Sequence, residues 1–365
     1  MQNWKTLTIY IARQFLLWCF VVFLTMATIV FLLDYVELIR RSGSHQDATL
    51  VVLLEMAALK QPYMWQQFMP FAILFGTMLT FWRMTRSNEL VVVRSAGISA
   101  WQFLSPIVAC ALVIGIAVVT VFNPIASTMQ TKYQKLESRV LRSGNDELAL
   151  TRSGLWLRQS DERGLPSVIH AESLASGGTV LEGVLILFFD NNDRVTSRID
   201  AKQAKLEDGH WLVTRGTRWQ PRNGQEPFTE LTVATNMTQG KIEQSFASPE
   251  TISFWDLPSY IALLEQSGFP AQRHRLEYDA LLARPFLLAA MVLVAAAFSL
   301  RMHRRGGTVL MIAAGVGSGF LLYLLSTFVF ALGQSATIPV YLAAWTPPGV
   351  SWLMGSSLLF HLEDG

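Results

Sequence analysis

The sequence contains long runs of residues without a charged side chain, and these runs decide what the chain can fold into. A helix needs about 20 largely apolar residues to cross the hydrocarbon core of a bilayer. Such runs lie at residues 14–33, 61–82, 103–122 and 285–300, and residues 306–360 contain no Asp, Glu, Lys or Arg. The last stretch is long enough for two spans, with a break near residues 333–339. We therefore predict six transmembrane helices.

The charged residues are concentrated between the third and fourth of these predicted helices. Residues 123–279 hold 37 of the 56 Asp, Glu, Lys and Arg side chains, whereas the other 208 residues hold 19. Overall, 15% of the residues are charged, compared with about 25% in typical soluble domains. We predict three parts: helices 1–3 in residues 1–122, a water-exposed domain in residues 123–279, and helices 4–6 in residues 280–365.

The inserted domain has the residue pattern of a β structure. Short alternating or β-branched runs recur through residues 151–246, and turn residues such as Asp208-Gly209 and Asn223-Gly224 separate several of them. Strands at this spacing predict a sandwich or jelly roll. Residues 123–142 and 256–282 have helical patterns and would join the sheet to the spans. The predicted fold class is an α-helical membrane protein with six transmembrane helices and an all-β, jelly-roll-like domain between helices 3 and 4.

Lys and Arg in the short connections indicate the orientation of the chain. If the N-terminus is cytoplasmic, eight basic residues of the short segments lie inside and three, Arg40, Arg41 and Lys60, lie outside. An excess of Lys and Arg marks the cytoplasmic side of membrane proteins. We therefore expect a multi-pass protein with both termini in the cytoplasm and the large domain on the outer side of the membrane.

The motifs of common catalytic and nucleotide-binding sites do not occur in the sequence. It contains no GxxxxGK[ST], HExxH or GxSxG, and Cys19 and Cys110 lie in apolar runs away from any Cys/His cluster. The net charge of +2 does not indicate nucleic-acid binding. His170 and His210 leave one enzymatic hypothesis open, a membrane-anchored enzyme acting on envelope lipid. A scaffold whose sheet edge pairs with a partner strand is another alternative.

The segment between the second and third uncharged runs carries a short predicted helix. It reads Arg83-Met-Thr-Arg-Ser-Asn-Glu-Leu-Val-Val-Val-Arg-Ser-Ala-Gly-Ile-Ser. Ser87 is a suitable N-cap, Glu89 lies in the first turn, and Gly97 would end the helix. Such a helix, at about residues 87–98 on the cytoplasmic surface, is either an interfacial connector or a docking helix for a cytoplasmic partner.

This segment resembles the coupling-helix signature of the LptF/LptG family of lipopolysaccharide-export permeases. Further similar pieces occur in the family's order: Tyr35-Val-Glu-Leu-Ile-Arg-Arg-Ser-Gly, Phe68-Met-Pro-Phe-Ala-Ile-Leu-Phe-Gly, Phe122-Asn-Pro, Gly154-Leu-Trp-Leu-Arg and Ile199-Asp-Ala-Lys-Gln-Ala-Lys-Leu-Glu-Asp-Gly-His-Trp. The resemblance covers essentially the whole chain. The exit of the first span and the Gly-Leu-Trp segment are more similar to the LptG branch than to LptF.

The resemblance implies a permease subunit of an ABC transporter in the inner membrane of a Gram-negative bacterium. The chain would pair with a sister subunit, and a dimer of a cytoplasmic ATPase, LptB, would dock below and bind ATP and Mg²⁺. The chain itself would then hold no cofactor or metal and catalyse no reaction. Lipopolysaccharide would enter between the first and fifth spans and pass to a periplasmic bridge that includes LptC and LptA.

The resemblance also implies a role for the acid in the short helix. Glu89 matches the coupling-helix acid, which would meet a basic residue of the ATPase. Arg86 and Arg94 flank it and belong to the same predicted ATPase-coupling site.

A second set of residues would contact the lipid. Arg40 and Arg41 match a basic pair suited to the phosphates of the lipid A head group, although snorkelling at the interface is a simpler role for them. Phe68 and Met69 match apolar positions that face acyl chains, or else belong to the core of the helix bundle. Asp34 departs from the family's pattern, in which a lysine can occur. An acid there repels phosphate unless Arg40 or Arg41 compensates for it or a divalent cation bridges the two.

Overall fold

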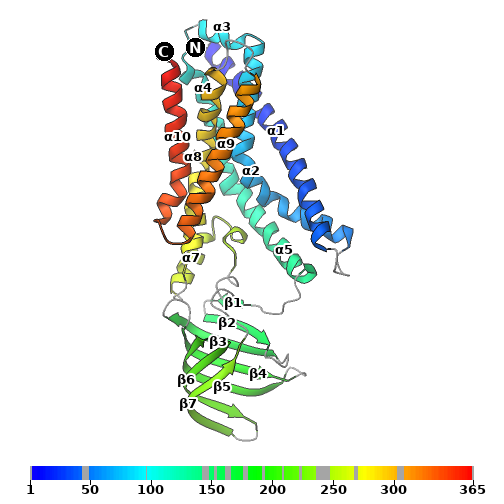
Figure 1. The fold of residues 1–365 in the computed structure, drawn as a ribbon, viewed down its shortest axis with the longest axis vertical. Coiled ribbons are helices and arrows are strands. Elements are labelled where there is room, and N and C mark those ends of the chain that lie inside the picture. The colour runs from blue at the N-terminus through cyan, green and yellow to red at the C-terminus, as the bar shows by residue number, and fades with distance from the viewer. Residues whose placement is uncertain are drawn as a thin grey trace. The chain divides into compact units, whose positions relative to one another are not determined.

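The computed structural model divides the chain into two compact units, one helical and one built on a sheet (Figure 1). The helical unit comprises Met1–Leu141, Ser253–Trp255 and His274–Gly365, and the sheet unit comprises Arg142–Ile252 and Asp256–Arg273. The structure describes residues 2–42, 49–95, 97–141, 148–151, 154–160, 166–175, 180–190, 194–207, 209–221, 224–235, 247–266, 270–301 and 308–363.

The described part of the helical unit contains seven long helices, and the uncharged runs of the sequence lie mostly within six of them. These helices are α1 (Gln2–Ser42), α2 (Leu50–Arg86), α4 (Ala100–Ala117), α5 (Asn123–Leu141), α8 (Gln272–Arg301), α9 (Thr308–Gln334) and α10 (Val340–Glu363). A π-helical turn, Val118–Phe122, joins α4 to α5, so the helix continues beyond the third run. The short helix α3 (Glu89–Ser95) lies between α2 and α4.

Four helices in the described part of the chain are long and apolar enough to cross a membrane, judged by length and composition. They are Thr6–Ser42, Ala100–Val140, Gln272–Leu300 and Ala313–Gln334. α2 and α10, with 37 and 24 residues, are also long. Their uncharged runs contain Gln, Pro, Ser and Gly residues, which lower the mean hydropathy. The predicted number of six spans therefore stays a prediction.

Helix α8 forms the centre of the helical unit, whereas α1 lies at its edge. In the apolar window of α8, 72% of the residues are buried, compared with 11% in that of α1. The residues from Leu288 to Ala297 are all buried, and most of them share one core with residues of α1, α2 and α4. Several of them are alanines, and small side chains let membrane helices approach closely. Most of the apolar surface of α1 is therefore left for lipid or for another protein chain.

Close contact between α1 and α2 depends on a glycine. A Cβ atom placed on Gly76 would lie 2.5 Å from the Cys19 Sγ atom and 2.7 Å from the Cys19 Cα atom. Any larger residue would collide with the backbone of α1. Helix α9 packs on α2 in a similar way, because Gly319 faces Leu74 and Phe71 of that helix.

The sheet unit contains one antiparallel sheet of seven strands. The strands are β1 (Leu148–Thr151), β2 (Gly154–Ser160), β3 (Pro166–Ala175), β4 (Val180–Phe189), β5 (Val195–Glu207), β6 (His210–Gln220) and β7 (Gly224–Ala234). The prediction of a β domain is confirmed. Its jelly-roll topology is wrong for the described strands, because each pairs only with its sequence neighbours in an up-and-down order. Short turns, with positive φ at Gly209 and Gly224, keep consecutive strands adjacent.

Two smaller elements also differ from the sequence expectation. Strand β1 pairs with β2 but was not predicted, because its four residues are too few to show an alternating pattern. The predicted single helix at residues 256–282 is replaced by α7 (Leu257–Gln266) and the first part of α8. The sequence places Gly268 and Pro270 between the two helices, and both residue types disfavour a continuous helix.

A row of residues across five strands interrupts the alternation of the sheet. The row consists of Glu172, Gly183, Lys202, Arg215 and Thr229, and we call it the crease. None of these residues pairs with the next within the ladders, although the residues on both sides do. In β4, the buried positions are two residues apart elsewhere but three apart across the crease. Gly183 and Arg215 have φ values of 62° and 53°, as in bulges that redirect side chains.

The crease keeps apolar side chains of both halves of the sheet on one buried face. Leu181 and Val184 lie on either side of it in β4 and are 0% and 2% exposed. In strict alternation, two residues three positions apart would point to opposite faces. The shift at Gly183 therefore gives the sheet a single continuous apolar face.

Candidate functional site

The short helix α3 lies at the end of the helical unit where both chain termini are found (Figure 1). Its apolar residues form two faces. Leu90 and Val93 are buried, whereas Val91 and Val92 are 59% and 65% exposed. The buried pair anchors α3 on the helical core, and the exposed pair leaves an apolar surface with no cover from the described residues.

The predicted cap of α3 is wrong by one residue. The Ser87 hydroxyl lies 3.0 Å from the Arg83 carbonyl oxygen, so Ser87 ends α2. Asn88, with a φ of 58°, makes the turn, and its carbonyl oxygen accepts the first helical hydrogen bond of α3 from Val92. Asn tolerates this left-handed conformation better than most residues. Gly97, with a φ of 77°, follows the helix as expected.

The carboxylate of Glu89 is bonded from two sides. The Tyr10 hydroxyl of α1 donates to Oε2 at 3.0 Å, and the Ser87 hydroxyl donates to Oε1 at 2.8 Å. Tyr10 and Glu89 are 79 residues apart in sequence. The acid of α3 therefore joins the start of α1 to the junction between α2 and α3.

Arg86, one of the two arginines predicted to act with Glu89, contacts an aromatic ring of α2. The Arg86 guanidinium lies 4.9 Å from the centre of the Trp82 ring, in the last turn of α2. This is a cation–π contact, which orients the side chain along α2. Arg94 belongs to α3, but its side chain lies outside the described residues.

At the opposite end of α1, Asp34 forms an ion pair with Lys60 of α2. The Lys60 Nζ and Asp34 Oδ1 atoms are 2.7 Å apart, and the two side chains are 25% and 16% exposed. The Gln61 amide also donates to Asp34, at 3.4 Å. The compensation expected from Arg40 or Arg41 thus comes from Lys60 instead, so Asp34 does not present an unpaired negative charge.

We predict that reversing the charge of Asp34 destabilises the protein and that reversing both partners restores it. Asp34→Lys places two ammonium groups together in a mostly buried position, at a cost of about 2–3 kcal/mol. The double variant Asp34→Lys/Lys60→Asp restores the ion pair in reverse and regains most of the lost stability. Thermal unfolding of the purified protein in detergent measures both effects. If the double variant loses as much stability as the two single variants together, the interaction between Asp34 and Lys60 contributes nothing to stability.

Arg40 and Arg41 are both engaged with carboxylates. Arg40 binds Glu37 through two hydrogen bonds of 2.8 Å. Arg41 lies 3.6 Å from Glu37 and 3.5 Å from Glu137 of α5. These side chains are exposed by 75% for Arg40 and 54% for Arg41. Exposed pairs contribute only about 0–1 kcal/mol, so a phosphate could replace the carboxylates at little cost.

Phe68 and Met69 lie in the packed interior of the helical unit. Phe68 is 7% exposed, and its ring centre is 5.6 Å from that of Phe23 on α1. Met69 is partly buried against the core. Phe23 of α1 packs on Phe68, so movement of α1 away from α2 would make Phe68 more accessible to a lipid.

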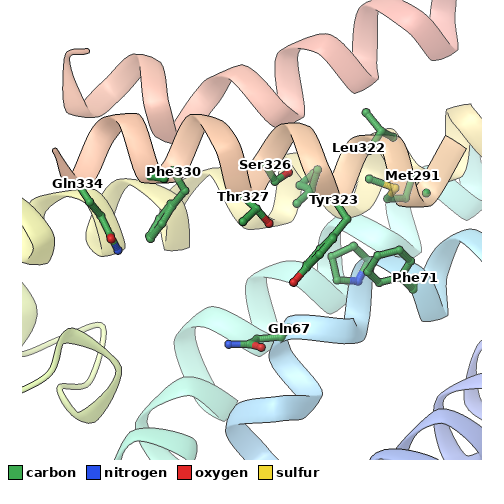
Figure 2. Close-up of a pocket in the computed structure, with 13 residues that line it drawn as sticks. Gln67, Phe71, Met291, Leu322, Tyr323, Ser326, Thr327, Phe330 and Gln334 are labelled. Atoms are coloured by element: carbon green, nitrogen blue, oxygen red, sulfur yellow. The ribbon is translucent and has the colours of Figure 1, made fainter. Parts of the chain in front are cut away.

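A pocket of about 410 Å³ lies between α2, α8 and α9 (Figure 2). Its apolar lining includes Phe71 of α2, Met291 of α8 and Phe330 of α9. Polar groups are fewer, and Figure 2 shows Tyr323 of α9 reaching toward Phe71 and Gln67 of α2. An apolar pocket with few polar groups suits a hydrocarbon chain better than a charged molecule.

A polar cluster lies one helical turn beyond this pocket. The Gln66 side-chain oxygen accepts hydrogen bonds from Arg284 at 2.9 Å and from Asn123 at 3.4 Å. Gln66 precedes the pocket residue Pro70 by four positions, and Arg284 precedes the pocket residue Leu287 by three. Residues at these spacings share a helix face. The pocket therefore has a positively charged group near one end.

The two histidines considered for catalysis are not brought together. The His170 ring of β3 contacts the Trp156 ring at a tilted angle, and the strand register aligns His170 with Leu185, Asp200 and then Thr217 of β6. His210 is seven residues from Thr217 along β6, which corresponds to about 23 Å. Among the described residues, no group of three or more His, Cys, Asp or Glu could hold a metal ion.

Comparison with known proteins identifies the family. The sequence profile described as "Lipopolysaccharide export system permease LptF/LptG" matches residues 9–361. The chain belongs to the LptF/LptG family. It is 24% identical over 302 residues to the lipopolysaccharide export system permease protein LptG of Escherichia coli K12, covering 81% of this chain and 82% of that protein. The protein of the same name from Haemophilus influenzae is 23% identical over 352 residues, covering 92% and 91%.

Membership of the LptF/LptG family makes this chain a multi-pass membrane permease of a lipopolysaccharide export system. The family consists of permease subunits and not of enzymes, so the enzymatic alternative loses its basis. The structure adds contacts to the site that the sequence did not indicate, through Tyr10, Lys60, Glu37 and Glu137. Tyr10, Lys60 and Glu137 are distant in sequence from the residues that they contact, whereas Glu37 is one helical turn from Arg40 and Arg41. Asp34, an acid directly after an uncharged run, was the signal in the sequence that called for a partner.

Proposed function

We propose that this chain is a membrane subunit of an ABC transporter that extracts lipopolysaccharide from the inner membrane, driven by a separate cytoplasmic ATPase. In this proposal, all six long helical segments cross the membrane and both termini are cytoplasmic. The sheet unit, inserted between the third and fourth spans, is periplasmic. A sister LptF or LptG chain completes the permease.

Helix α3 is the observation that carries this proposal. It places Glu89 and the exposed pair Val91 and Val92 at the end of the helical unit that holds both termini. An apolar surface beside a carboxylate suits a groove on a partner that also carries a basic residue. We assign that partner to an LptB dimer, which would bind ATP and Mg²⁺ outside this chain.

The cargo would contact the chain at two levels. Arg40 and Arg41 would exchange their carboxylate partners for phosphates of the head group, since guanidinium groups bind both in the same two-pronged manner. An acyl chain would occupy the pocket between α2, α8 and α9. Phe68 and Met69 would join this surface when α1 separates from α2.

The sheet unit would receive the cargo after extraction. Its continuous apolar face, made possible by the crease, is suited to acyl chains. From there lipopolysaccharide would pass to a bridge containing LptC and LptA.

Purification of the full chain in mild detergent, followed by identification of copurifying proteins and lipids, tests the proposal. We expect a sister permease, a nucleotide-binding protein and lipopolysaccharide to be recovered together. The proposal would be contradicted if the chain were recovered without the sister permease and without the nucleotide-binding protein from cells that express both of these proteins.

A further inference from the structure

Helix α1 packs on its neighbours along one narrow face and has polar contacts at both of its ends. Only 11% of its apolar window is buried. One end is bonded to Glu89 through Tyr10, and the other is bonded to α2 and α5 through Asp34 and Arg41. A long helix that is buried along one narrow face and has polar contacts at both ends can shift as a rigid body when one of those contacts is displaced.

Of the two hydroxyl groups that donate to Glu89, that of Tyr10 has fewer competing acceptors than that of Ser87. The Ser87 hydroxyl has a single proton but three acceptors within reach, namely Glu89 and the carbonyl oxygens of Arg83 and Met84. The Tyr10 hydroxyl donates to Glu89 Oε2 at 3.0 Å. Because the acceptor is a carboxylate, this bond is stronger than one between neutral groups.

Glu89 can keep this bond while it binds a partner. A carboxylate has about four lone-pair positions, of which Tyr10 and Ser87 use two. A basic group of a docked ATPase can take a third. A displacement of the acid by that partner would then be passed on to α1 through the phenolic hydroxyl.

We propose that Tyr10 is a positioning residue that transmits the movement of α3 to α1. This inference rests on the proposed coupling function of Glu89. Movement of α1 would uncover Phe68, which α1 covers through Phe23, and would shift the helix end that carries Arg40 and Arg41. One hydroxyl group would thus link ATP hydrolysis in the partner to the surface that meets the lipid.

The test uses the complete transporter in liposomes that contain lipopolysaccharide and measures lipid extracted per ATP hydrolysed. Tyr10→Phe removes only the hydroxyl, and we expect the ratio to fall about five- to tenfold. Tyr35→Phe is the matched control on the same helix, because its hydroxyl has no hydrogen bond to the described residues. We expect it to match the wild type, and Ser87→Ala to have a smaller effect than Tyr10→Phe.

The outcomes separate this inference from the proposed function. If Glu89→Lys blocks extraction but Tyr10→Phe extracts as much lipid per ATP as the wild type, the link through Tyr10 is wrong and the coupling role of Glu89 stands. If Glu89→Lys also behaves like the wild type, the proposed coupling function itself fails. A purely structural role for Tyr10 would lower recovery of the assembled complex and leave the ratio unchanged, which also overturns the inference.

Discussion

Replacing Glu89 with lysine is expected to separate this permease from its ATPase. The substitution puts a positive charge where a basic residue of the partner would dock, and it removes the acceptor of both Tyr10 and Ser87. Reversal of one partner in an interfacial charge pair costs at least about 2 kcal/mol, or about 30-fold in affinity. Copurification of the ATPase and lipid-dependent ATP hydrolysis measure the loss.

Two further variants make the Glu89 experiment specific. Glu55→Lys changes the net charge of the chain by the same amount at an exposed position of α2, and we expect normal assembly. Glu89→Gln keeps an oxygen acceptor without the charge and should give an intermediate result. Assembly and transport at wild-type levels in Glu89→Lys would remove Glu89 from the proposed docking site.

Substitution of Gly76 by leucine is expected to produce a large loss of stability in the helical unit. The new Cβ atom would lie 2.7 Å from the Cys19 Cα atom and 2.9 Å from the Cys19 backbone nitrogen. No rotation of a side chain relieves a collision with backbone atoms, so α1 and α2 must separate. Overpacking usually costs about 1–3 kcal/mol, and we expect at least the upper end of this range. Thermal unfolding in detergent measures it.

Gly317 of α9 provides a matched control for this substitution. It is also a helical glycine, but a Cβ atom there would meet no atom within 4 Å. Gly317→Leu therefore makes the same chemical change in open space, and the higher helix propensity of leucine favours it slightly. Similar unfolding temperatures for Gly76→Leu and Gly317→Leu would show that the close approach of α1 and α2 is not needed for stability.

The sequence predicted most of the long helices well because all except α5 are marked by a local property, a run without charge. It predicted less well where a structural feature depends on distant residues. Asp34 and Lys60 are 26 residues apart and belong to different helices, so only the packing of α1 on α2 shows that they pair. The same holds for Tyr10 and Glu89, which nothing in either local sequence connects.

Local signals were also ambiguous at the ends of elements. Ser87 satisfied the sequence pattern of an N-cap, yet the carbonyl groups at the end of α2 compete for the same hydroxyl. The strands were predicted from their alternation, but alternation does not specify the order in which strands pair. For Phe68 the sequence left a lipid-facing position and a place in the bundle core open, and no sequence pattern indicates its contact with Phe23 of α1.

The crease crosses five neighbouring strands and divides each of them into two parts. On each side of Glu172, Gly183, Lys202, Arg215 and Thr229, neighbouring strands pair residue by residue, and in β4 the crease shifts the buried positions by one residue. Removing one residue from a strand on either side would turn every following side chain of that strand to the opposite face. Removing two would keep the faces and shorten the strand. Changes in the length of this apolar surface during evolution should therefore occur in steps of two residues per strand, while the crease itself stays in place.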